Sequence, residues 1–203
     1  MKTALSIQSH VVHGYVGGRA AVFPLQTLGW DVDTVNTVNF SNHTGYGSVR
    51  GSKLSSEEVK ELLKGISEIG VEYQAVFTGY IPNAELITAI GTYISQLKQS
   101  QKVMYLLDPV MGDQGYLYVD KSCVDEYRLL LERHIVDVMT PNQFELELLC
   151  DNPIHSLTDL KHSINFIHKK FKVKYVVVSL VVGLDGLDDK YIYCAILAGT
   201  GLV

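Results

Sequence analysis

The sequence has few of the residues that would place it outside the reducing interior of a cell. Its 203 residues include only three cysteines, Cys123, Cys150 and Cys194, which are far apart and show neither a paired framework nor the spacing of a metal site. Reduced thiols in a cytoplasmic protein are therefore expected, with the nucleus as a second candidate compartment.

Long apolar runs and an excess of basic charge are also missing. No stretch approaches the roughly 18 apolar residues that cross a bilayer. The N-terminal apolar run is interrupted by Gln8, Ser9 and His10, which is not the pattern of a signal peptide. The formal net charge is −5, with lysine and arginine scattered along the chain. The sequence therefore predicts neither a membrane nor a nucleic-acid partner.

What the sequence does contain is an alternation of strand-like and helix-like segments. Short apolar or β-branched runs predict strands at residues 3–9, 32–38, 75–80, 103–108, 135–140 and 175–180. Helical patterns lie between them, beginning near Arg19, Ser55, Leu86, Asn142 and Ser156. This alternation predicts an α/β fold with a mostly parallel sheet covered by helices, formed by residues 1–203 as a single domain.

Polar side chains occupy the ends of most predicted strands. They are Ser9 and His10, residues 39–44, residues 78–80, Asp108, Thr140 with Asn142, and Ser179. In open parallel sheets, ligands bind beyond the carboxyl ends of the strands. We therefore expect these groups to face one shared polar pocket.

Two glycine-containing stretches follow the first two predicted strands. In "NFSNHTGYG" (39–47), Gly45 and Gly47 would let the backbone pass close to a flat ligand, although a polar β-turn explains the same composition. In "SHVVHGYVGGRAA" (9–21), the glycine spacing does not match a dinucleotide fingerprint. That second stretch is either a wide turn or a loop that wraps a small planar ligand.

Two further stretches carry carboxylates. In "DPVMGDQGYLYV", Asp108 closes a strand and Asp113 follows in a glycine-flanked loop, which suits Mg²⁺ bound through carboxylates and phosphate oxygens; a strand cap and a surface turn are the alternative. In "TPNQFELELL", Asn142 and Glu145 have capping-box spacing, which is a sufficient structural reason for both. Glu145 is also placed to orient a metal-bound water.

Together with "FTGY" (77–80) and the N-terminal 43 residues from Leu5, these stretches resemble pyridoxal kinases of the ribokinase-like superfamily. The resemblance implies a three-layer α/β/α fold with a central, mostly parallel sheet. It also implies transfer of the ATP γ-phosphoryl group to the 5′-hydroxymethyl group of pyridoxal, pyridoxine or pyridoxamine. Mg²⁺ or another divalent cation is the implied cofactor, K⁺ is a further candidate, and a homodimer is the implied assembly.

The resemblance also assigns site residues. Those matching the vitamin site are Ser9, Val16, Phe40, His43, Thr44 and Tyr80. Those matching the ATP site are Asp108, Asp113, Tyr118, Thr140, Asn142, Glu145 and Ser179. Three of the latter, Asp108, Asp113 and Glu145, are expected to hold the metal directly or through water.

No catalytic residue is assigned. The family places its base in a Gly-Thr-Gly-Asp segment of the C-terminal third, whereas here Gly199-Thr200-Gly201 is followed by Leu202. The base is expected beyond the end of this sequence, the C-terminal third of the fold is expected to be missing, and little or no turnover is expected from these 203 residues. Two alternatives stay open: a non-catalytic relative that binds vitamin B6 or dimerises, and a hydroxymethylpyrimidine kinase-like protein.

Overall fold

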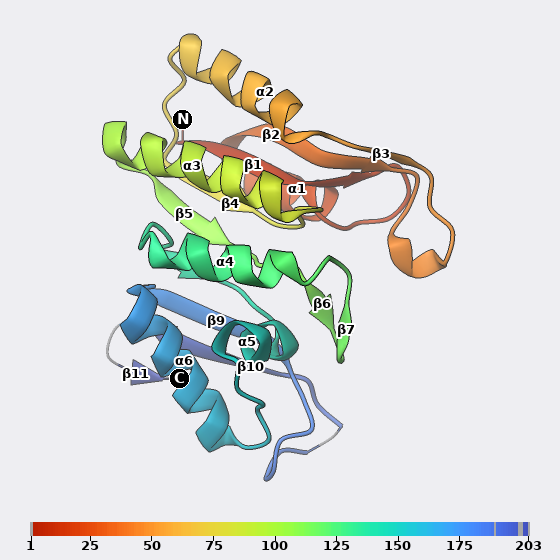
Figure 1. The fold of residues 1–203 in the computed structure, drawn as a ribbon, viewed down its shortest axis with the longest axis vertical. Coiled ribbons are helices and arrows are strands. Elements are labelled where there is room, and N and C mark those ends of the chain that lie inside the picture. Colours follow the sequence, from red (N-terminus) through yellow and green to blue (C-terminus); the bar gives the residue numbers. More distant parts are fainter. Residues whose placement is uncertain (1, 189, 199–200, 203) are drawn as a thin grey trace. The chain divides into compact units, whose positions relative to one another are not determined.

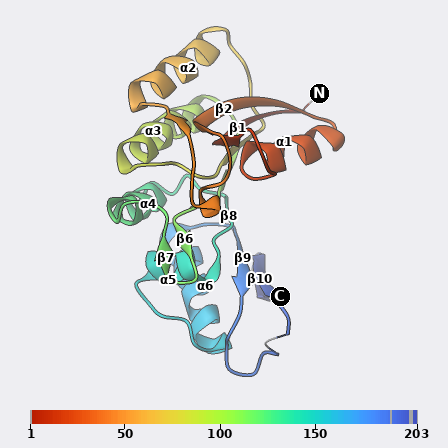
Figure 2. The same ribbon diagram turned by 90° about the vertical axis from the view of Figure 1, so that its right-hand side faces the viewer.

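The structure is a computed structural model that describes residues 2–188, 190–198 and 201–202. The chain divides into two compact units, residues 1–105 and 106–203, and each is described by itself (Figures 1 and 2). Strand β5 (Met104–Leu107) contains the residues at which the first unit ends and the second begins. None of the helices in the described part of the chain is both long and apolar enough to cross a membrane.

The first unit has a sheet in the order β4-β1-β2-β3. Strand β1 (Lys2–Val11) lies parallel to both β2 (Trp30–Phe40) and β4 (Ala75–Thr78), and the short β3 (Gly51–Lys53) pairs antiparallel with the end of β2. Its helices are α1 (Gly18–Thr27), α2 (Ser56–Glu68) and α3 (Ala84–Ser100), with a 3₁₀ turn, η1, at Thr44–Tyr46. The middle of β1, residues 4–7, is buried, as expected for a strand with neighbours on both sides.

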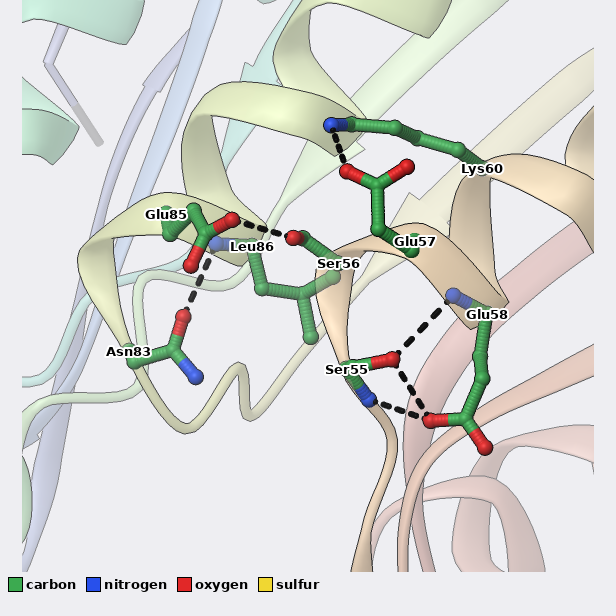
Figure 3. Close-up of polar contacts among 8 residues, drawn as sticks. All are labelled: Ser55, Ser56, Glu57, Glu58, Lys60, Asn83, Glu85 and Leu86. Atoms are coloured by element: carbon green, nitrogen blue, oxygen red, sulfur yellow. Dashed lines mark hydrogen bonds and ion pairs between the residues drawn. The ribbon is translucent and has the colours of Figure 1, made fainter.

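Helices α2 and α3 lie side by side, and each begins at a capped end (Figures 1 and 3). The Ser55 hydroxyl accepts the N–H of Glu58, whose carboxylate accepts the N–H of Ser55 in return. Asn83 caps α3 by accepting the N–H of Leu86. The Ser56 hydroxyl of α2 donates to the Glu85 carboxylate of α3, which ties the two helix starts together. The predicted capping box at Ser55 is therefore confirmed.

The second unit has the strand order β5-β8-β9-β10-β11. Strands β5, β8 (Val138–Met139) and β9 (Tyr175–Val181) are parallel, whereas β10 (Tyr193–Ala198) and β11 (Gly201–Leu202) are antiparallel. A small hairpin, β6 (Gly112–Asp113) with β7 (Tyr116–Leu117), stands apart from this sheet. The helices are α4 (Ser122–Glu132), α5 (Gln143–Cys150) and α6 (Leu157–Phe171).

The predicted elements are confirmed in type and differ in extent. The strand predicted over 135–140 has only two residues, because residues 135–137 form an irregular connection between the turn at Arg133 and His134 and the strand. Helix α4 was not predicted, although Val124, Tyr127 and Leu131 repeat at helical spacing and are buried. The short strands β3, β6, β7 and β11 were also missed, since strands of two or three residues carry no periodic signal. Residues Gly199 and Thr200 of the Gly-Thr-Gly match lie outside the described residues.

Candidate functional site

The stretch 39–47 forms the connection from β2 towards β3, and two of its polar residues hold the loop itself. The Ser41 N–H donates to the Arg50 carbonyl (2.7 Å), and the Ser41 hydroxyl accepts the Arg50 N–H (3.0 Å). The Asn42 side-chain amide donates to the Ser48 carbonyl (2.9 Å) and the His43 carbonyl (3.0 Å). Both residues therefore act as loop braces, as the turn interpretation of the sequence requires.

The next two residues of this loop are exposed. Nδ1 of His43 accepts the N–H of Gly45 (3.1 Å) and so caps the η1 turn. This contact requires an unprotonated Nδ1, which leaves Nε2 as the N–H donor of the neutral ring. A Cβ at Gly45 would lie 2.9 Å from that Nδ1, so glycine is needed there. Thr44 begins the turn with its side chain exposed to solvent. Of the residues predicted for the vitamin site, His43 and Thr44 are thus the two that this loop exposes.

The glycine loop after β1 lies beside this stretch. The N–H groups of Val12 and His13 donate to the carbonyls of Phe40 and Ser41, both at 2.9 Å. Farther along, Gly17 has a φ of 54° and packs on Ser9 so closely that a Cβ would lie 2.3 Å from the Ser9 hydroxyl oxygen. Only glycine fits that approach. The loop is therefore folded back onto Ser9.

The first unit therefore gathers most of its predicted vitamin-site residues at the carboxyl ends of β1 and β2. Ser9 is buried, and Val16 directly precedes Gly17, the glycine that packs on Ser9. Phe40 precedes the loop that Ser41 and Asn42 brace. Tyr80 is half-buried, and its carbonyl accepts the hydroxyl of Thr37, three residues before Phe40 (2.7 Å). Gly17 was not among the predicted site residues, because a glycine beside Gly18 in a loop does not reveal a contact with Ser9.

The second unit holds the residues predicted for ATP, arranged around the start of α5. The Glu145 carboxylate is buried and accepts three backbone N–H groups. Its Oε2 accepts Asn142 (2.8 Å), and its Oε1 accepts Met111 (2.9 Å) and, at a longer 3.5 Å, Gly112. Glu145 therefore completes the predicted capping box and also anchors the segment that leads into the β6–β7 hairpin.

Asn142 supports the same hairpin from its other polar group. Its Oδ1 accepts the Glu145 N–H (2.8 Å), while its side-chain amide donates to the Gly112 carbonyl (2.7 Å). A Cβ at Gly112 would lie 2.2 Å from the Tyr116 carbonyl oxygen, so this approach also needs glycine. The hairpin that carries Asp113, with Tyr118 just beyond it, is thus held by α5 through hydrogen bonds 30 to 34 residues apart in sequence.

Burial perturbs both acidic groups near α5. Burial raises the pKa of Asp108 to about 6, and a hydrogen bond with Thr140 opposes that rise. Burial likewise raises the pKa of Glu145 to about 7, with the charge of Asp108 adding to the effect and the backbone donors opposing it. The structure thus places Glu145 close to Asp108.

Tyr118 and Ser179 complete the group. Burial, with the charges of Asp113 and Glu145, raises the pKa of Tyr118. The Ser179 N–H donates to the Pro141 carbonyl (3.0 Å), and Ser179 forms a bridge with Asn142. Contacts therefore join Asp108 with Thr140, and Asn142 with Glu145 and Ser179. Asp113 and Tyr118 lie on, or just beyond, the hairpin that Asn142 and Glu145 hold.

These residues fit a magnesium ion that is only partly held by protein. Both Glu145 oxygens already accept backbone donors, so Asp108 is the better candidate for direct coordination. Across residues 2–188, 190–198 and 201–202, no three His, Cys, Asp or Glu side chains form a metal-binding cluster. Magnesium often keeps several waters and uses one or two carboxylates with substrate phosphates, which suits this arrangement. An ion caged by three side chains does not fit.

The raised pKa values predict that the chain loses stability as the pH rises from about 4.5 to 7. In that range the carboxyls of Asp108 and Glu145 are ionised in the unfolded chain but still protonated in the folded one. Unfolding therefore releases protons, and it becomes more favourable as the pH rises. A pKa rise of this size for either group corresponds to about 3 kcal/mol of folding free energy. Because the two groups interact, their combined effect is less than twice that value. Chemical denaturation across this pH range, without divalent ions, should show the decline, and Glu145→Gln should flatten it. A stability that rises steadily to pH 7 would contradict it.

Comparison with known proteins identifies the family. The family model described as phosphomethylpyrimidine kinase matches residues 26–192. The protein BUD17 of Saccharomyces cerevisiae is 47% identical over 196 residues, covering 94% of this chain and 62% of that protein. Pyridoxal kinase of Ovis aries is 43% identical over 181 residues, covering 86% of this chain and 58% of the sheep protein. The chain therefore spans less than two thirds of the length of these relatives.

A solved structure of a pyridoxal kinase also matches this chain. Pyridoxal kinase from Leishmania donovani, in complex with ADP and pyridoxamine, matches with a TM-score of 0.88 and 36% identity, covering 97% of this chain and 69% of that one. The chain belongs to the pyridoxal kinase family. The ribokinase-like fold class implied by the sequence is thereby confirmed, as is the resemblance on which it rested. Pyridoxal kinase from Plasmodium falciparum with AMP-PNP and PL also matches, with a TM-score of 0.86 and 29% identity.

Proposed function

We propose that this chain supplies the vitamin-binding and metal–nucleotide-binding parts of a pyridoxal kinase. The reaction would transfer the γ-phosphoryl group of ATP to the 5′-hydroxymethyl group of pyridoxal, pyridoxine or pyridoxamine. The observation that carries the proposal is the cluster around α5, in which Asp108 lies beside a Glu145 that is fully engaged by backbone donors. The relatives solved with ADP or AMP-PNP support it.

In this proposal the two units have separate tasks. The first presents Ser9, His43 and Thr44 to the polar groups of the pyridine ring, with Val16, Phe40 and Tyr80 as apolar contacts. Because Ser41 and Asn42 brace the loop, the ring-binding residues are ordered before a ligand arrives. Such preorganisation reduces the entropy cost of binding.

The second unit would hold the phosphates and their cation. Asp108 would coordinate Mg²⁺, and Thr140, Asn142, Tyr118 and Ser179 would surround the phosphates. When bound, the ion would neutralise charge that develops on the transferring phosphoryl group. Asp113 would contribute through water. We assign no catalytic base among the described residues, and homodimer formation, a K⁺ requirement and a cytoplasmic location stay predictions.

The vitamin site can be tested by replacing Thr44 with alanine. Loss of one hydrogen bond to the ring should weaken pyridoxal binding about fivefold to tenfold, or about 1 kcal/mol. Because Thr44 is exposed, thermal stability should not change. Isothermal titration of the 203-residue chain with pyridoxal measures the effect. Ser48→Ala, an exposed hydroxyl in the same loop, is the matched control. Equal affinities for all three proteins would contradict the assignment of Thr44.

A second candidate substrate follows from the family model, whose description names a phosphomethylpyrimidine kinase. A hydroxymethylpyrimidine ring would present a similar flat, polar edge to the same loop. The relatives that bind B6 compounds favour pyridoxal. Titration of the same preparation with both rings distinguishes the two, since tighter binding of the pyrimidine would reverse the assignment.

A further inference from the structure

We propose that Ser179 and Leu180 form a strained bulge that aims the Ser179 hydroxyl at the nucleotide phosphates, which makes Leu180 a positioning residue. The inference deepens the function proposed for the second unit and rests on it. It begins from a backbone feature of β9 that the sequence did not predict.

The register of β9 shows the bulge. On the side of β8, the pairing register of β9 is constant. Val138 lies opposite Tyr175 and, farther along, Asn142 lies opposite Ser179. On the other side, its pairing with β10 shifts. Ala195 lies opposite Val178 and Tyr193 opposite Val181, so two β9 residues face the single residue Cys194. The extra residue lies on β9.

Leu180 adopts the conformation that makes this possible. Its φ is 51°, in the left-handed region that a leucine rarely enters, because its Cβ approaches the next carbonyl oxygen. Its side chain is 42% exposed, whereas Val178, two residues earlier, and Val181, the next residue, are buried. In a regular strand Leu180 would face the same side as Val178, and Val181 would turn outward. The bulge reverses this arrangement.

Contacts on both sides of Leu180 show what the strained residue maintains. The Ser179 N–H donates to the Pro141 carbonyl (3.0 Å), and the Val182 N–H donates to Oε1 of Gln143 (3.1 Å). Both acceptors lie at the start of α5, beside Asn142 and Glu145. The extra residue thus lets β9 follow the start of α5 while it stays paired with β10. Bulges and strained residues of this kind occur next to active sites, where they redirect a side chain.

The test separates the backbone of residue 180 from its side chain. Leu180→Gly and Leu180→Asn tolerate positive φ and should bind ATP with Mg²⁺ within about twofold of the unaltered chain. Leu180→Ile has the same atoms as leucine but is β-branched, so it should straighten the bulge and weaken binding about tenfold. Val182→Ala, which removes apolar surface of similar exposure, is the control. Isothermal titration with ATP and Mg²⁺ gives each affinity.

A double-mutant comparison with Ser179→Ala shows whether Leu180 acts through Ser179. If it does, Leu180→Ile combined with Ser179→Ala should bind no more weakly than Ser179→Ala alone. Equal binding by Leu180→Ile and the unaltered chain would overturn the inference and leave the proposed function intact. Weakened binding by Leu180→Gly and Leu180→Asn would also overturn it, even if Leu180→Ile failed to fold. Absence of ATP binding by the unaltered chain would overturn the proposed function and this inference together.

Discussion

Replacing Asp108 with asparagine is expected to weaken magnesium-dependent ATP binding strongly and to make the folded chain more stable. Loss of the carboxylate removes the proposed ligand of the ion, which should weaken binding by roughly two orders of magnitude, or about 3 kcal/mol. Burial raises the pKa of Asp108 to about 6, so at pH 8 the folded state carries a buried charge. Asparagine keeps an acceptor for Thr140 without that charge, and stability should rise by up to about 3 kcal/mol.

The opposite signs of these two effects make the result informative. A variant that merely misfolded would lose both binding and stability, whereas this one should lose binding alone. Titration with ATP at several magnesium concentrations and urea unfolding at pH 8 measure the two quantities. Asp125→Asn, at an exposed carboxylate on α4, is the matched control. It should leave ATP binding unchanged and alter stability by no more than about 0.5 kcal/mol, because its ion pair with Arg128 is exposed. Unchanged affinity in Asp108→Asn would remove Asp108 from the nucleotide site.

Replacing Glu145 with alanine should give the largest loss of stability. The substitution leaves the buried N–H groups of Met111, Gly112 and Asn142 without their acceptor. Each orphaned donor costs about 1–3 kcal/mol, and the longest of the three bonds contributes least, so a total loss of about 3–5 kcal/mol is expected. Urea unfolding at pH 6, below the raised pKa of Glu145, measures the difference.

A local measurement distinguishes the loss of the Glu145 hydrogen bonds from a general loss of packing. Hydrogen exchange should accelerate first in the β6–β7 hairpin, because Glu145 and Asn142 both hold the segment before it. Glu132→Ala, at the exposed end of α4, should change stability by no more than about 0.5 kcal/mol. A Glu145→Ala protein as stable as the control would show that the Glu145 hydrogen bonds contribute little to stability.

The opening of α5 shows how far prediction from the sequence could go. The spacing of Asn142 and Glu145 predicted their mutual capping, because that exchange of hydrogen bonds is completed within four consecutive residues. It did not predict that the remaining Glu145 oxygen serves Met111 and Gly112, more than thirty residues earlier. From the sequence, Glu145 was expected to hold the metal directly or through water. In the structure its two oxygens accept backbone N–H groups of Asn142, Met111 and Gly112.

The loop at 39–47 shows the same difference between what neighbouring residues reveal and what distant partners decide. Its composition predicted a polar, glycine-dependent loop, and the resemblance to pyridoxal kinases named His43 and Thr44 as ligand-binding candidates. Composition alone could not separate these two from Ser41 and Asn42, because all four are polar and lie together. The separation comes from the partners Arg50 and Ser48, which reach Ser41 and Asn42 only when β3 folds back along β2.

The sequence by itself determined most helix starts, most of the longer strands, the α/β class and the residues that carry the family's motifs. These follow from interactions between near neighbours, namely caps, apolar periodicity and β-branched runs. Only the tertiary structure decided that Gly17 packs on Ser9, that Glu145 anchors the β6–β7 hairpin and that Leu180 adopts a left-handed conformation. Each of these depends on a partner strand or loop distant in sequence, whose position is set by the packing of the whole unit.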